Sequence, residues 1–131
     1  TLDQPHHLIE DWIGIARLKL AQKEYESARE YAQQALTYLD KNPVLAGAID
    51  RFRDFRFLWE TLQTLGPPEA ADRVLSLAAD IMLKYLEQNK DPAVQAIYLD
   101  QPHHAALWAA HQRQQTAGRE APQISDSEQT S

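Results

Sequence analysis

The chain has 131 residues and a formal net charge of −6, from 13 basic and 19 acidic side chains, and it contains no cysteine. Its length suits one domain that buries a core without covalent staples. The missing cysteines exclude disulfides, thiol catalysis and cysteine-ligated zinc. The acidic balance argues against nucleic acid as a general partner, because phosphate binding needs concentrated Lys and Arg. Only 4 glycines, beside many Ala, Leu, Gln and Glu, favour helices.

An apolar stripe near the start of the chain predicts the first helix. Pro5 can open this helix with Asp3 as its cap, because an early helical position needs no backbone donor. Apolar residues that recur at steps of three and four are expected to form its buried face: Leu8, Trp12, Ile15, Ala16 and Leu20.

Two further stripes predict the second and third helices. The second runs from Tyr25 to Leu39 and must end before Pro43, which disfavours helical backbone at the preceding residue. The third carries the large apolar residues Phe52, Phe55, Trp59, Leu62 and Leu65. Gly66 suits the C-terminal cap of this third helix.

Prolines mark the starts of the later helices. Pro68 suits the first turn of a fourth helix, which stays apolar on one face through Leu86. Pro92 begins a short fifth helix that reaches about Tyr98, and a sixth helix follows. No segment alternates with the period of a strand. The sequence therefore predicts an all-α fold of about six helices, arranged as stacked antiparallel hairpins.

The end of the chain has a different composition. Residues 116–131 are polar and contain a single large aliphatic residue, Ile124, so they cannot bury enough surface to offset the cost of ordering. We therefore expect a helical domain over residues 1–115 and a disordered polar tail or linker over residues 116–131. No signal peptide or apolar run of membrane length is evident, and we expect a cytoplasmic protein. Because the chain does not begin with Met, we also expect it to be a piece of a longer protein.

Several residues of the first hairpin follow one spacing pattern: Trp12, Ile15, Ala16, Tyr25, Ala28, Ala35 and Leu36. In this pattern the first hairpin resembles the tetratricopeptide repeat, in which small residues let two helices approach closely and large aromatic residues fill the space between neighbours. Trp12 and Tyr25 would be these aromatic residues. The sequence departs from the family at Lys19, where an aromatic is usual, and at Pro43, which comes three residues late.

The region from Trp12 to Ala110 is similar, in the order of its features, to the last part of tetratricopeptide arrays in large bacterial signalling and transcriptional regulators. This resemblance implies an α-solenoid that acts as a protein–protein interaction module and binds a protein or peptide. The sequence has no glycine-rich phosphate loop, no nucleophile elbow and no metalloprotease helix motif, so we expect no enzyme activity, no catalytic residue, no cofactor and no metal. The family's groove positions, carried over to the first hairpin, are Glu10, Ile13, Gly14, Arg17, Leu20 and Ala21.

The hexapeptide LDQPHH occurs twice, at Leu2–His7 and at Leu99–His104. Read as structure, it marks a joint at which one helix ends and proline allows the next to begin. Read as chemistry, it supports an alternative function, a metal-dependent enzyme or metal-binding helical protein. That alternative would use the paired histidines His6, His7, His103 and His104. No third ligand is evident beside either copy.

A second alternative is a nucleic-acid-binding helical solenoid. It rests on the segment DRFRDFR, in which three arginines alternate with Asp50 and Asp54. The carboxylates neutralise this patch, so we expect a solvated, ion-paired helix face instead.

We also expect the isolated chain to self-associate. Apolar residues spread around more than one face of the first helix, namely Leu8, Trp12, Ile13 and Ile15. An interior repeat lacks a polar cap and leaves such a face open, and a two-fold dimer through the terminal helices is the simplest way to cover it.

Overall fold

The structure is a computed structural model of the whole chain. It describes the backbone of residues 6–45 and 50–130, and the side chains of residues 8–45 and 50–117. Over these residues the fold is all-α, with six helices and no strand, as the sequence predicts. Pro5 and Asp3, which were expected to open the first helix, lie outside the described residues.

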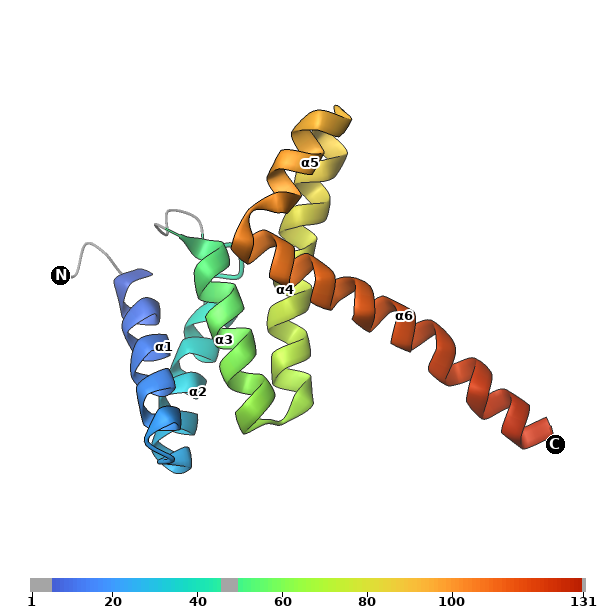
Figure 1. The fold of residues 1–131 in the computed structure, drawn as a ribbon. Coiled ribbons are helices and arrows are strands. Elements are labelled where there is room, and N and C mark those ends of the chain that lie inside the picture. Colours follow the sequence, from blue (N-terminus) through green and yellow to red (C-terminus); the bar gives the residue numbers. More distant parts are fainter. Residues whose placement is uncertain (1–5, 46–49, 131) are drawn as a thin grey trace.

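The helices pack as a bundle with one long arm (Figure 1). In chain order they are α1 (His6–Ala21), α2 (Tyr25–Lys41), α3 (Arg51–Leu65), α4 (Pro68–Gln88), α5 (Pro92–Asp100) and α6 (Pro102–Thr130). Short connections fold α1 against α2 and α3 against α4 as two hairpins. Helix α1 lies at one edge of the bundle, and α5 lies beside the last turns of α4.

Local sequence signals set the helix boundaries. The Asp50 carboxylate accepts a hydrogen bond from the backbone N–H of Arg53 at 3.2 Å and caps α3. The backbone N–H of Gly66 donates to the carbonyl of Leu62 at 2.7 Å, with a φ of 72° that glycine adopts readily. Pro68 stands in the first turn of α4, where its missing N–H costs nothing.

The second LDQPHH segment is a joint between helices, as expected. Helix α5 ends at Asp100 and Pro102 begins α6. The backbone N–H of Ala105 donates to the carbonyl of Gln101 at 2.7 Å and closes the first turn of α6. In the first LDQPHH copy only His6 and His7 belong to a described helix, and their side chains lie outside the described residues.

The same kind of contact occurs twice along the chain. Helix α3 packs against both helices of the first hairpin, and α6 packs against both helices of the second. Because α3 has neighbours on several sides, its buried residues cover much of its circumference: Phe52, Asp54, Phe55, Leu58, Trp59, Thr61, Leu62 and Leu65.

The buried face of α1 differs from the predicted one. Ile9, Ile13 and Ala16 are buried, whereas Leu8, which was expected in the core, is 49% exposed. Trp12, Ile15 and Leu20, also expected there, are only half-buried. The prediction is confirmed for Ala16, while Trp12 and Leu20 only pack against the edge of the core. It was wrong for Leu8 because two adjacent faces of α1 are apolar, and steps of three and four residues fit both of them.

The small residues of the first hairpin behave as predicted. Ala16, Ala28 and Ala35 are completely buried in the core. Tyr25 was expected to fill space between neighbours, but it is 46% exposed, so that expectation is wrong. Trp12 instead packs edge-on against Tyr38 of α2, with ring centroids 6.2 Å apart.

Helix α6 continues through the segment expected to be a disordered tail or linker. Its backbone is helical as far as Thr130, so it differs from that expectation in secondary structure. The side chains of α6 are described only as far as Ala117. The division into a packed domain over residues 1–115 and a separate tail therefore stays a prediction.

Candidate functional site

The expected groove residues on α1 lie partly inside the contact with α3. Ile13 is 3% exposed and belongs to the core, so it offers no surface to a partner. Glu10 accepts a hydrogen bond from the Arg53 guanidinium at 3.2 Å. The guanidinium carbon of Arg17 lies 3.8 Å from the centre of the Phe57 ring. The side chains of Glu10 and Arg17 thus join the two hairpins.

The other three groove residues lie nearer the surface. Gly14 and Ala21 are exposed, and Leu20 is half-buried. A Cβ added at Gly14 would meet no other atom within 4 Å. These residues are accessible, but only as small or partly covered side chains, and the groove over α1 remains a prediction.

A buried carboxylate in α3 was not anticipated from the sequence. Asp54 is 3% exposed, and its Oδ2 atom has no hydrogen-bond partner. Burial, followed by the negative charge of Glu10, raises the pKa of Asp54 to about 7. A signal for this burial was present, since Asp54 lies four residues before Leu58 and eleven before Leu65, on one face of the helix.

The arginines of α3 make contacts within the fold. Arg56 pairs with Glu60 at 3.2 Å, and Arg53 pairs with Glu10 at the same distance. Arg51 donates to the carbonyl of Val44 at 3.3 Å. The expectation of an ion-paired face is confirmed for Arg53 and Arg56. The expectation that the whole segment is solvated is wrong.

The histidines of the second LDQPHH copy pack against α3. The Nδ1 atom of His103 lies 3.3 Å from Nη1 of Arg56, and because a guanidinium only donates, this nitrogen accepts. The His104 ring lies 4.1 Å from the Phe52 ring and 4.6 Å from the Tyr98 ring, measured between centroids. Burial lowers the pKa of His104, which favours its neutral form.

The structure leaves the metal hypothesis untested. Among the described side chains, no three His, Asp or Glu groups gather so that they could hold a metal ion. The side chains of His6 and His7 are not among those described. Within the described part of the chain, no helix combines the length and the apolar character needed to cross a membrane.

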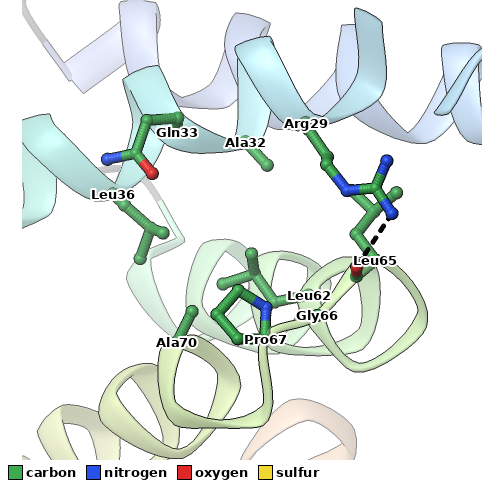
Figure 2. A pocket seen from close by; sticks show the side chains of 9 residues that line it. All are labelled: Arg29, Ala32, Gln33, Leu36, Leu62, Leu65, Gly66, Pro67 and Ala70. Atoms are coloured by element: carbon green, nitrogen blue, oxygen red, sulfur yellow. Dashed lines mark hydrogen bonds between the residues drawn. The ribbon is translucent and has the colours of Figure 1, made fainter. Parts of the chain in front are cut away.

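A hollow of about 190 Å³ lies between α2 and the turn from α3 to α4 (Figure 2). Its floor is apolar, and Arg29 and Gln33 line it from α2. Arg29 donates to the carbonyl of Leu65 at 3.3 Å, so its charge lies at the negative end of the α3 dipole. The hollow is smaller than a typical ligand pocket, and Arg29 already has a structural role there.

One side of α1 presents apolar side chains to solvent. Leu8 and Leu18 are 49% and 55% exposed, and Ile15 between them is half-buried. We call Leu8, Ile15 and Leu18 the α1 outer face. Beside α1, Trp12 and Tyr38 line a shallow hollow of about 300 Å³. These side chains form an apolar surface on the first hairpin that the contact with α3 leaves uncovered.

Comparisons with known proteins return no match. No protein-family model, no curated protein and no solved structure is significantly similar to the chain. The resemblance to tetratricopeptide repeats therefore rests on the residues of this sequence alone, chiefly those of the first hairpin.

Proposed function

We propose that this chain is a protein–protein interaction module, a helical scaffold of tetratricopeptide-like hairpins that belongs to a larger bacterial regulatory protein in the cytoplasm. The observation that supports it is the repeated contact in which α3 packs on α1 and α2, and α6 packs on α3 and α4. Hairpins that stack in this way cover each other's apolar faces and leave one face open at each end.

The α1 outer face is the open face at the start of this stack. Leu8 and Leu18 are about half exposed there, although burial of such side chains stabilises by about 1.5–3 kcal/mol each. In a longer array a preceding hairpin would cover them. In the isolated chain the occupant is the same face of a second copy.

A two-fold dimer through this face has a defined geometry. Two-fold contacts are self-complementary, so the residue nearest the axis meets itself. Ile15 is the residue of the α1 outer face that lies between the other two, seven residues after Leu8 and three before Leu18. The two copies of α1 would therefore cross close to Ile15.

Cross-linking tests this proposal, because the chain has no cysteine of its own. Ile15→Cys should form an intermolecular disulfide under mild oxidation, since the dimer holds the two thiols together. Ile97→Cys is the matched control, because Ile97 is 70% exposed on α5, away from the proposed contact. Equal cross-linking of the two variants would show random collision and contradict the proposed dimer.

A further inference from the structure

Two carboxylates from different hairpins lie near one arginine in the contact between α1 and α3. Glu10 on α1 accepts from the Arg53 guanidinium through Oε1, while its Oε2 atom is buried without a hydrogen-bond partner. Asp54 on α3 is almost completely buried, and its Oδ2 atom is also unpartnered. Unpaired buried oxygens are rare in folded proteins because each one costs free energy.

The charges around Asp54 do not balance. Glu10 faces it from α1, and Asp50 and Arg53 act on it from α3, which gives three carboxylates for one guanidinium. Asp50 is also close enough to act on His104 of α6, and burial favours the neutral form of that imidazole. A proton on Asp54 removes one buried negative charge and its repulsion with Glu10.

We propose that the contact between α1 and α3 is a proton-linked joint, in which a proton held by Asp54 beside Glu10 keeps the first hairpin packed on the second. Loss of this proton leaves two negative charges facing each other with one arginine between the hairpins. The first hairpin then opens more often. This inference stands on the carboxylate pair and is independent of the proposed interaction module.

The direction of the pH dependence follows from the raised pKa. When α1 leaves α3, Asp54 returns to water and to its ordinary pKa of 3.8, whereas in the packed state its pKa is about 7. The packed state therefore holds more protons between these two values. The stabilisation that this proton gives to the packed state is complete below pH 3.8 and is lost as the pH rises to about 7.

Carbon-13 NMR of the aspartate carboxyl groups tests the pair directly. In the full chain Asp54 should titrate with a midpoint near pH 7. Glu10→Gln should lower this midpoint, because it removes the neighbouring charge and releases Arg53 to act on Asp54. Asp72→Asn, which removes an exposed carboxylate from α4, should leave the midpoint unchanged. A midpoint near the ordinary value, or one that Glu10→Gln does not move, would overturn the proposal.

Hydrogen exchange then tests the joint. After correction for intrinsic exchange, the opening constant of α1 amides should rise by up to about tenfold per pH unit where Asp54 is protonated only in the packed state. Amides of α4 should change less, and Asp54→Asn should flatten the α1 curve.

Every variant keeps His104, so the contribution of this histidine is common to all the curves. Its lowered pKa gives it a pH dependence opposite to that of Asp54. If Asp54→Asn does not fold, Glu10→Gln can replace it, and the pH dependence of the α1 opening constant should then be flattened to a smaller extent. A constant α1 curve, or equal changes in α1 and α4, would overturn the joint.

Discussion

The guanidinium carbon of Arg17 on α1 lies 3.8 Å above the centre of the Phe57 ring on α3. This contact joins the two hairpins and uses a side chain that the sequence assigned to a binding groove. A cation over an aromatic face contributes about 0.5–1 kcal/mol when partly exposed. The contact between hairpins thus combines an apolar core with polar pairs at its edge.

A double-mutant cycle measures this contact. Arg17→Gln and Phe57→Leu should each destabilise the chain, and the two effects should couple by about 0.5–1 kcal/mol in urea unfolding. Arg73→Gln combined with Phe57→Leu is the control, because Arg73 pairs with Asp40 of α2 instead. If the effects of the two substitutions on the free energy of unfolding are additive, the contact between the Arg17 guanidinium and the Phe57 ring does not stabilise the fold.

Enlarging a buried alanine should overpack the first hairpin. Ala35→Leu adds three carbon atoms where the side chain is completely buried, and it should cost about 1–3 kcal/mol of unfolding free energy. Gln34→Leu, at the exposed neighbouring position, should change stability by less than about 0.5 kcal/mol. Similar small effects at both positions would contradict the close packing of α1 on α2.

His104 should make the fold sensitive to acid. Burial lowers its pKa below the ordinary 6.5, so the folded state binds fewer protons than the unfolded state below that pH. Its contribution to stability is present above about pH 6.5 and is lost as the pH falls. His104→Phe keeps the ring contacts with Phe52 and Tyr98 but has no proton to bind. Unfolding curves of this variant should lose less stability on acidification than wild type, and an unchanged acid response would exclude His104 as the cause.

Added zinc should not stabilise the chain. His103 uses Nδ1 to accept from Arg56, and His104 packs against two aromatic rings, so both imidazoles already have partners within the fold. Thermal unfolding should give the same midpoint with zinc and with a chelator. A higher midpoint in zinc that is lost in a His6→Ala, His7→Ala double variant would support the metal alternative instead.

Much of the fold was predictable because its signals are local. Proline at Pro68, Pro92 and Pro102, together with the Gly66 cap, marks helix boundaries without knowledge of the neighbours. The face of α1 that is buried depends on where α2 and α3 pack, which is a tertiary fact. Leu8 and Ile9 are equally apolar, and the sequence does not say which one meets another helix.

The polar contacts between hairpins were harder to anticipate. Arg53 and Asp54 belong to a segment whose sequence is typical of a charged surface. In the structure, however, Arg53 pairs with Glu10 of α1, and Asp54 is buried. Charge alternation along a helix shows that pairs can form, but not whether the partner lies on the same helix. Asp54 could have been recognised from its spacing to Leu58. Its coupling to Glu10, 44 residues away in the sequence, follows only from the packing of α1 on α3.

Sedimentation equilibrium of the isolated chain at micromolar concentration tests the proposed interaction module most directly. Wild type should be a dimer. Leu18→Glu, which places a charge on the α1 outer face, should be a monomer, and Ile97→Glu should remain a dimer although Ile97 is the more exposed residue at 70% against 55%. A monomeric wild type, or a dimer that Leu18→Glu leaves intact, would contradict the proposal that α1 presents an open interaction face.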